Sequence, residues 1–275
     1  MYSNIQIIIE PKKSSAQYWT AIWAQRELLF FLAWRDILVR YKQTIIGILW
    51  SVLRPLLTMF FFTIVFNKLA GLESGKIPYP VMVLAGVVPW QFFSSALVDS
   101  SNSLLSNSNM VSKIYFPRLI LPMSAILGNL VDFLISFILL LLLMAFYKMP
   151  PTWHIILVVP MILLTIYALL GFGFWFSALN ARYRDFRYIV PFMLQMGLFV
   201  SPIGFSSEVV PEKWRILYSM NPMVSIIDGF RWVITAGEFP IIWSSFFVSF
   251  VVMTIIFYSG LKYFQKAENN LADVI

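Results

Sequence analysis

The sequence predicts an all-α membrane protein with six transmembrane helices, an N-terminal amphipathic interface helix and an outer-face re-entrant helix pair between spans five and six. The first observation behind this prediction is composition. Of 275 residues, 60% are hydrophobic and 12% are charged, and the mean hydropathy is +0.79, whereas a soluble domain has about 25% charged residues. So few charges cannot cover a water-exposed surface, which excludes soluble and disordered proteins.

The second observation is segment length. A helix needs about 20 apolar residues to cross the hydrocarbon core. None of the long apolar segments alternates polar and apolar residues as barrel strands do, so helices are expected. The fifth segment is the weakest, because it contains Pro191, Pro202 and Gly204. The expected spans cover residues 45–66, 80–98, 121–146, 155–177, 188–206 and 241–263, and they divide the chain into an N-terminal tail, 1–44, and a transmembrane domain, 45–275.

The distribution of Lys and Arg predicts the orientation. With an N-terminus in the cytoplasm, thirteen Lys and Arg residues fall on the cytoplasmic side and six on the outer side, which agrees with the positive-inside rule. Both termini are therefore expected in the cytoplasm. The net charge of +7 is typical of nucleic-acid binding proteins too, but cytoplasmic loops that face anionic lipid need the same balance. With so little soluble surface, we expect membrane lipids as partners and no nucleic acid.

Residues 19–42 are expected to lie along the cytoplasmic membrane interface. They contain an apolar run, Leu28 to Trp34, flanked by charges. Seven residues rise only about 10 Å as a helix, which is too short to span, and no signal-peptide pattern precedes them. Tryptophan and arginine at headgroup level are typical of an interfacial helix, although a simple anchor has the same pattern.

Three connections carry further information. Residues 99–120 are rich in Ser and Asn, and their apolar residues recur at helical spacing, which predicts either a surface helix for docking or an extension of the second span. Residues 181–188 form a basic, aromatic turn that suits lipid phosphate. In the outer loop 207–240, Pro211 and Pro222 are expected to begin two short helices, 211–220 and 222–236, with Asn221 capping the second.

Catalytic chemistry has little support. The chain has no cysteine and one histidine, His154, so thiolate and histidine-cluster metal sites are excluded. The segment Gly71 to Ile77 resembles a phosphate loop, but it has three residues between its glycines and lacks the Ser or Thr that contacts magnesium. We therefore expect no catalytic residue, no metal and no cofactor on this chain.

Two ionisable residues are expected inside the membrane, where such groups are costly and often functional. Arg54 lies about 14 Å and Asp132 about 16 Å from the cytoplasmic ends of their spans at the usual helical rise. One hypothesis is that they form an ion pair between the first and third spans. The alternatives are that Arg54 extends to the interface, or faces a wet channel and meets an anionic substrate.

Several motifs resemble those of bacterial ABC-type polysaccharide export permeases, which export O-antigen, capsule or teichoic-acid polymers. The resemblance begins with Arg40 to Trp50 followed by Arg54 and Pro55, continues through Gly86 to Trp90, and ends with Tyr218 to Met223. The segments Ile114 to Arg118 and Asn180 to Asp185 lie between them in the same order. The resemblance therefore covers nearly the whole chain.

The resemblance implies a homodimer that binds two copies of a separate cytoplasmic ATPase, which carries the ATP and Mg. It implies that 102–115 is the coupling helix, that the N-terminal helix borders a cytoplasmic gate for the diphosphate of a lipid-linked glycan, and that the outer hairpin is a paired gate. The residues placed in these roles are Arg35, Arg40, Tyr41 and Lys42 at the cytoplasmic gate, Asn107, Met110, Lys113, Tyr115 and Arg118 in ATPase coupling, and Trp214, Tyr218, Asn221 and Pro222 at the outer gate.

A polymer channel needs surfaces that hold sugar rings weakly at many sites, and aromatic faces do this without fixing the register. Interfacial aromatic residues are also common in any membrane protein, so the set is a hypothesis. The expected channel residues are Trp50, Arg54, Phe61, Phe62, Trp90, Phe93, Trp175 and Phe199.

The sequence thus predicts the permease subunit of an ATP-driven exporter of lipid-linked polysaccharide, most consistent with O-antigen, in the bacterial inner membrane. The alternatives are an ABC permease for a drug or lipid and, in another class, a membrane scaffold or a glycan-processing enzyme.

Overall fold

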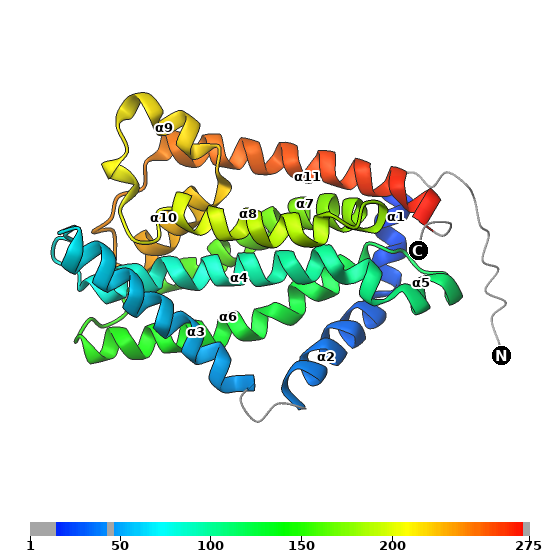
Figure 1. Ribbon diagram of the computed structural model, residues 1–275, viewed down its shortest axis with the longest axis horizontal. Helices are drawn as coiled ribbons and strands as arrows, with labels where there is room; N and C mark the ends of the chain where they lie inside the picture. The colour runs from blue at the N-terminus through cyan, green and yellow to red at the C-terminus, as the bar shows by residue number, and fades with distance from the viewer. Residues whose placement is uncertain (1–14, 43–46, 272–275) are drawn as a thin grey trace.

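A computed structural model describes residues 15–42 and 47–271, so the first 14 residues of the tail and the first two residues of the first expected span lie outside the described part. Within these ranges the regular elements are all helices (Figure 1). The long helices lie side by side along the long axis of the molecule. The elements are α1 Ser15–Ala24, α2 Arg26–Lys42, α3 Gly47–Phe62, η1 Thr63–Leu69, α4 Tyr79–Ser106, α5 Ser108–Lys113, α6 Ile120–Phe146, η2 Trp153–Leu157, α7 Val158–Arg182, α8 Phe186–Val200, η3 Ser207–Val209, α9 Glu212–Ser219, α10 Pro222–Ile234 and α11 Trp243–Leu271.

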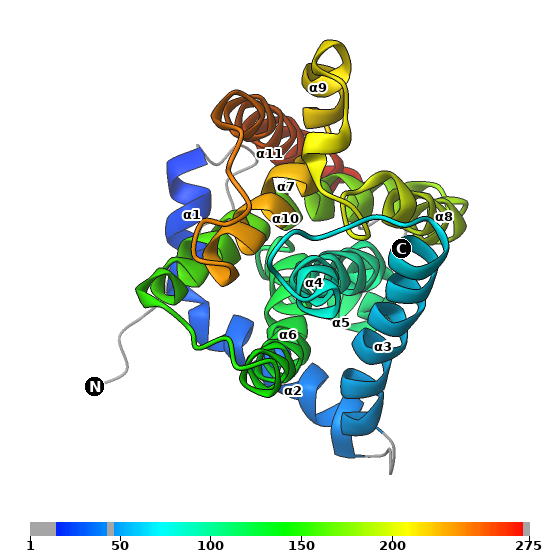
Figure 2. The same cartoon turned by 90° about the vertical axis from the view of Figure 1, so that its left-hand side faces the viewer.

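Helix α4 forms the centre of the bundle. In the end-on view of Figure 2 it is surrounded by α3, α6, α7, α8 and α10. Its segment Val81–Val88 is apolar all round and fully buried, which is expected of a helix that is covered by protein on every side. Helices α6 and α7 pack directly on α4, whereas α11 packs mainly on α7.

Helices α7 and α11 pack closely through two glycines, Gly171 and Gly260. A Cβ atom on Gly260 would lie only 2.5 Å from the carbonyl oxygen of Gly171. A larger residue would therefore force the two helices apart.

Five described helices are long and apolar enough to cross a membrane: Leu49–Leu69, Tyr79–Ser106, Ile120–Phe146, Trp153–Arg182 and Trp243–Glu268. They correspond to five of the expected spans and support a multi-pass membrane protein. The remaining expected span, 188–206, overlaps α8, which begins at Phe186 and ends at Val200. Fifteen residues rise about 22 Å, less than the hydrocarbon thickness. The count of six spans therefore stays a prediction.

The expected interface helix consists of α1 and α2. On α2, Leu29, Leu32 and Ala33 are buried, and this helix packs mainly against α6. The aromatic residues Phe31 and Trp34 of α2 remain exposed. A helix with an apolar protein contact and exposed aromatic residues suits the boundary between protein and lipid, although its depth in a membrane stays a prediction.

The connection 99–120 combines both of the structures expected for it. Helix α4 extends the second span as far as Ser106, and α5 then forms a separate short helix. In Figure 1, α5 lies at the same end of the molecule as α1 and the end of α11.

The outer loop folds as a helix pair. Helix α9 begins at Glu212, one residue after the expected Pro211. The Asn221 side chain accepts a hydrogen bond from the Met223 amide at 3.1 Å, so the predicted cap of α10 is confirmed. Helix α10 is buried along most of its length and packs on α4, α7 and α11, although re-entry into a membrane stays a prediction.

Candidate functional site

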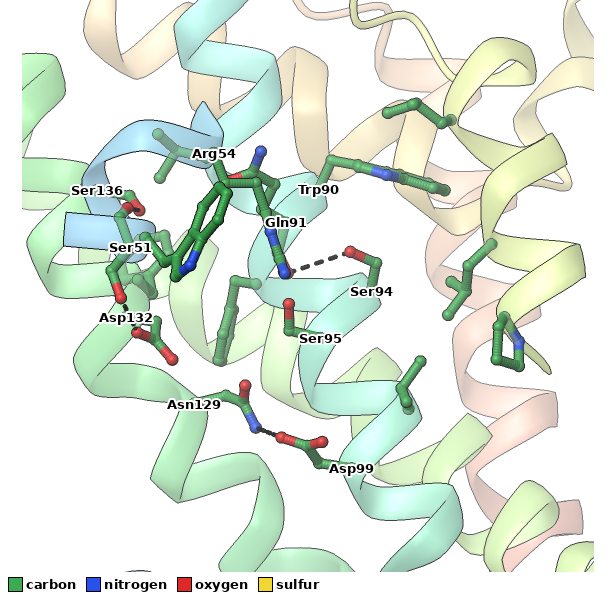
Figure 3. A pocket seen from close by; sticks show the side chains of 18 of the residues that line it. Ser51, Arg54, Trp90, Gln91, Ser94, Ser95, Asp99, Asn129, Asp132 and Ser136 are labelled. Atoms are coloured by element: carbon green, nitrogen blue, oxygen red, sulfur yellow. Dashed lines mark hydrogen bonds between the residues drawn. The ribbon is translucent and has the colours of Figure 1, made fainter. Parts of the chain in front are cut away.

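A cavity of about 1170 Å³ opens between α3, α4, α6 and α8 (Figure 3), and Arg40 from the end of α2 also lines it. The helices that bound it contribute both aromatic and polar side chains. The lining residues are Arg40, Trp50, Ser51, Arg54, Val88, Trp90, Gln91, Phe92, Ser94, Ser95, Val98, Asp99, Asn129, Asp132, Phe133, Ser136, Pro191, Leu194, Gln195 and Leu198.

One face of α4 contributes four polar side chains to the cavity. Gln91, Ser94, Ser95 and Asp99 recur at helical spacing and line the cavity together. Figure 3 shows these side chains along one side of α4, with Asn129 and Asp132 of α6 nearby. The cavity therefore offers amide and hydroxyl groups along α4 in addition to the charged groups of Arg40, Arg54, Asp99 and Asp132.

Arg40, at the end of α2, is the centre of a polar network. Its Nη2 lies 2.6 Å from Asp99 Oδ2, and its Nη1 forms an ion pair with Asp132 and donates to Asn129 Oδ1 at 3.1 Å. Asp132 also accepts hydrogen bonds from the hydroxyl groups of Tyr41 and Ser51. The network thus joins α2, α3, α4 and α6 at the edge of the cavity.

Both α2 residues of the network have shifted pKa values. Burial by itself lowers the pKa of Arg40, but Asp99 and Asp132 more than offset this and raise it above its ordinary value. Burial, followed by the hydrogen bond to Asp132, raises the pKa of Tyr41. Arg40 is therefore a permanent cation in this network, and Tyr41 is a neutral donor.

The predicted Arg54–Asp132 ion pair is wrong. Asp132 pairs with Arg40 instead, and among the ion pairs of the described residues none involves Arg54. Arg54 is exposed and lines the cavity, which is the arrangement that the channel alternative predicts. The sequence-based hypothesis considered only ionisable residues inside the expected spans. It therefore did not include Arg40, which lies on the helix before the first span.

The predicted channel aromatics occupy several different environments. Trp50 and Trp90 line the cavity. Phe62 stacks on Phe199 with ring centroids 6.3 Å apart, Phe61 is exposed, and Phe93 is buried against Phe172.

Trp175 does not belong to the cavity lining. Its ring stacks on Tyr263 at 4.4 Å, and its Nε1 donates to Ser259 at 3.0 Å. It therefore stabilises the contact between α7 and α11.

The residues predicted for ATPase coupling differ in their surroundings. Met110, Lys113 and Tyr115 lie on or just after α5, where Lys113 and Tyr115 are exposed. Arg118 is engaged within the chain, because its Nη1 donates to the Glu268 carbonyl at 2.7 Å and its amide donates to Glu268 Oε1 at 3.0 Å. Arg118 therefore holds the end of α11 against the loop that follows α5.

Three of the four predicted cytoplasmic-gate residues also have partners within the chain, including Tyr41, which donates to Asp132. Arg35 donates to Asp36 at 2.7 Å and to Asn107, the residue before α5, at 2.9 Å. Arg40 is paired as described above, whereas Lys42 is exposed at the end of α2. The cluster expected to hold a diphosphate is thus partly neutralised by carboxylates.

At the other end of the molecule, Trp214 is exposed on α9 and Pro222 is buried at the start of α10. The Tyr218 hydroxyl is buried without a hydrogen-bond partner in the described part of the chain, and burial raises the pKa of Tyr218. Asn221, besides capping α10, donates to Ser201 Oγ at 3.0 Å. The outer helix pair is thus attached to the segment that follows α8.

Arg231 is a structurally prominent residue that sequence reasoning treated only as a loop cation. Its side chain is 1% exposed and donates to the carbonyl oxygens of Met82, Phe205 and Ile203 at 3.3, 2.7 and 2.6 Å. An arginine between Phe230 and Trp232 in an apolar helix is the signal that indicates its burial.

Asp99 and Asn129 were also missed as site residues, because they were assigned to a loop and to an apolar span. In the sequence, Asp99 lies at helical spacing from Gln91 and Ser95, and Asn129 lies at helical spacing from Asp132. This spacing is the pattern that indicates a shared polar face. Within the described residues, no group of three or more His, Cys, Asp and Glu side chains is placed to hold a metal ion.

Comparisons with known proteins agree with this architecture. The chain is 27% identical to an O-antigen export system permease protein RfbA of Klebsiella pneumoniae over 251 residues, 90% of this chain and 95% of the relative. It is 28% identical to the RfbA protein of Myxococcus xanthus over 80% of this chain and 84% of the relative. It is 23% identical to the polysialic acid transport protein KpsM of Escherichia coli over 74% of this chain and 79% of the relative.

The family model described as ABC-2 type transporter matches residues 27–235, from α2 to the end of α10. That range includes the cavity, the Arg40 network and α5, and it confirms the family on which the functional prediction depends. The chain therefore belongs to the ABC-2 type transporter family.

Proposed function

We propose that this protein is the transmembrane permease subunit of an ATP-driven exporter that moves a lipid-linked polysaccharide, of the O-antigen class, across the bacterial inner membrane. The observation that carries the proposal is the large cavity, in which two tryptophans lie with amide and hydroxyl side chains from α4 and α8. Sugar rings stack on aromatic faces, and their hydroxyl groups exchange hydrogen bonds with such side chains. Two of the relatives are named for O-antigen export and a third for polysialic acid transport, which supports a polysaccharide substrate.

The energy for transport is proposed to come from a separate protein. In this proposal two copies of the chain form the pathway, two copies of a cytoplasmic ATPase carry the ATP and Mg, and α5 with Met110, Lys113 and Tyr115 docks on the ATPase. The exposure of Lys113 and Tyr115 next to that helix supports this surface. Both termini are then cytoplasmic, since α5 and the described end of α11 lie at one end of the molecule (Figure 1).

The anionic end of the substrate is proposed to meet the cations at the end of α2 and in the cavity. Arg54 and Lys42 are exposed, so they are available for a diphosphate without breaking an ion pair. Arg40, held by two carboxylates, has to exchange partners before it binds an anion. At the other end, the exposed Trp214, Ile216 and Leu217 of α9 suit contact with a second copy at an outer gate.

The test is depletion of the protein in its host, followed by labelling of the lipid-linked glycan in intact and opened cells. We expect the glycan to accumulate on the cytoplasmic face while surface polymer is lost. Wild-type protein should restore export, and Trp90→Ala with Gln91→Ala should restore it poorly.

Trp243→Ala is the matched control, because Trp243 is exposed at the start of α11 and lies outside the cavity. Normal surface polymer after depletion, without internal glycan, would exclude polysaccharide export and favour a permease for a drug or lipid.

A further inference from the structure

A second, smaller cavity of about 510 Å³ lies between α2, α4 and α6, next to the large one. Its lining includes Arg35, Asp36, Ser106 and Asn107, the last of which directly precedes α5. The small cavity therefore lies toward the α5 end of the molecule. Arg40 and Asp99 line both cavities, so their ion pair stands between the two.

We propose that the Arg40–Asp99 ion pair is the barrier between these cavities, and that it opens when α2 moves together with α5. When the pair separates, the small cavity joins the large one and a continuous aqueous path leads from the α5 end toward Trp50 and Trp90. This inference rests on the proposed export function and names the place where the pathway is closed.

Hydrogen bonds and ion pairs connect the barrier residues to α2, α4 and α6. Asp99 belongs to α4 and receives Arg40 Nη2 at 2.6 Å and Asn129 Nδ2 of α6 at 2.8 Å. Arg40 also holds Asp132 of α6. The arginine thus bridges the two helices that bound both cavities.

The chemistry of the pair suits a barrier that opens and closes. The Arg40 and Asp99 side chains are 34% and 41% exposed, and a partly hydrated ion pair contributes little net stability. When it separates, water hydrates both charges, whereas separation of an apolar plug would expose hydrophobic surface. Once Arg40 has separated from Asp99, its positive charge is also free to bind an incoming anionic group.

The structure provides a link between this barrier and α5. Arg35 and Arg40 belong to the same helix, and Arg35 Nη2 donates to Asn107 Oδ1 at 2.9 Å. Asn107 lies between α4 and α5 and donates to the Ser103 carbonyl at 2.9 Å. A displacement of α5 that breaks the Asn107–Ser103 hydrogen bond moves Asn107 away from α4. Arg35 and Arg40 then follow Asn107 because they belong to one helix, whereas Asp99 stays with α4.

The test uses the absence of cysteine from the chain, which makes an introduced cysteine a unique probe. Ser95→Cys places a thiol in the large cavity, and Ser106→Cys places one in the small cavity. A charged, membrane-impermeant maleimide is applied to the full-length protein in membrane vesicles, from the α5 side and, separately, from the other side. We expect Ser106→Cys to react rapidly from the α5 side and Ser95→Cys to react slowly.

Removal of the ion pair should open the path. Asp99→Asn is expected to accelerate labelling of Ser95→Cys from the α5 side about threefold, the effect of losing one partly hydrated ion pair, and to leave labelling from the other side unchanged. Asp99→Glu should restore slow labelling because it keeps the carboxylate. Asp36→Asn is the matched control, since it removes the Arg35 ion pair in the small cavity and leaves Arg40 intact.

The barrier proposal is contradicted if Ser95→Cys in the parent protein reacts as fast as Ser106→Cys from the α5 side. It is also contradicted if Asp36→Asn accelerates labelling as much as Asp99→Asn. Labelling needs neither glycan nor ATP, so failure of the export proposal and failure of the barrier give separate results. With the ATPase bound, ATP should accelerate labelling and Arg35→Ala should abolish that acceleration. No acceleration by ATP, or acceleration that persists in Arg35→Ala, would overturn the link to α5.

Discussion

At the scale of single residues, two arginines with opposite environments hold the molecule together. Arg40 is partly exposed and lies between carboxylates, whereas Arg231 is buried and donates only to backbone carbonyl oxygens among its hydrogen-bond partners in the described residues. A buried arginine suits that second role because its planar group presents several donors in fixed directions. Arg231 thereby satisfies carbonyl groups of the irregular segment that follows α8.

The Arg40–Asp132 contact predicts non-additive stability. Arg40→Ala and Asp132→Ala should each lower the thermal unfolding midpoint of the purified protein, and the double variant should lose less than the sum, with a coupling of about 0.5–3 kcal/mol. Arg54→Ala combined with Asp132→Ala is the control and should be additive, since these residues form no ion pair. Coupling in the control and additivity in the first pair would contradict the network.

Arg231→Met should destabilise the protein strongly. Methionine retains much of the side-chain volume but removes three charge-assisted hydrogen bonds, each worth about 1.5–3 kcal/mol, and a total loss of at least about 3 kcal/mol is expected. The measurement is again the thermal unfolding midpoint. Arg215→Met is the matched control, because Arg215 also donates to a carbonyl, that of Val210, but its side chain is 31% exposed. Similar losses in both variants would argue against a special role for Arg231.

At the scale of elements, the molecule divides functions between short and long helices. The long helices α4, α6, α7 and α11 pack tightly, with glycines where α7 meets α11. The short helices α5 and α9 lie at opposite ends (Figure 1) and carry exposed residues. Because they contribute little to the core, they are free to present a surface to other proteins.

The short helix α5 gives a prediction that separates docking from folding. Lys113→Glu should weaken co-purification of the partner ATPase while the unfolding free energy changes by less than about 0.5 kcal/mol, because Lys113 is exposed. Arg118→Glu should instead lower the unfolding midpoint, since it places a carboxylate against Glu268. Lys76→Glu, in an exposed loop, is the charge control. Unchanged ATPase binding in Lys113→Glu would exclude this residue from the docking surface.

At the scale of the whole molecule, the cavity is bounded by helices that are poorly covered on one side. Leu57 and Phe60 of α3 and Phe192 and Met196 of α8 are all exposed, and these two helices flank the large cavity. A second copy of the chain facing α3 and α8 would enclose the cavity. Lipid would cover the other exposed apolar residues.

This arrangement predicts a specific cross-link. Phe61→Cys, on α3, should give a disulfide-linked dimer when membranes are oxidised, because two copies that face each other through α3 and α8, as proposed, would bring this helix near its equivalent. Leu163→Cys is the control, since Leu163 is equally exposed but belongs to α7. Cross-linking at residue 163 without cross-linking at residue 61 would place the interface between copies on another face.

Much of the architecture is predictable because it depends on local properties of the sequence. Whether about 20 residues enter a membrane depends on their own hydrophobicity, so five expected spans correspond to described helices, although the second helix extends eight residues beyond its expected end. The cap at Asn221 follows from adjacent residues. By itself, then, the sequence determined the membrane class, five of the long helices and, through motifs spread along the chain, the family.

The tertiary structure decided which side chains meet. Arg40 is 92 positions from Asp132 and 59 from Asp99, and Arg231 is 149 positions from Met82. Trp175 and Trp90 are both tryptophans in apolar helices, yet one packs between α7 and α11 and the other lines the cavity. The physical reason is that each partner depends on the rotation and tilt of whole helices, which the packing of many side chains sets jointly and no local pattern contains.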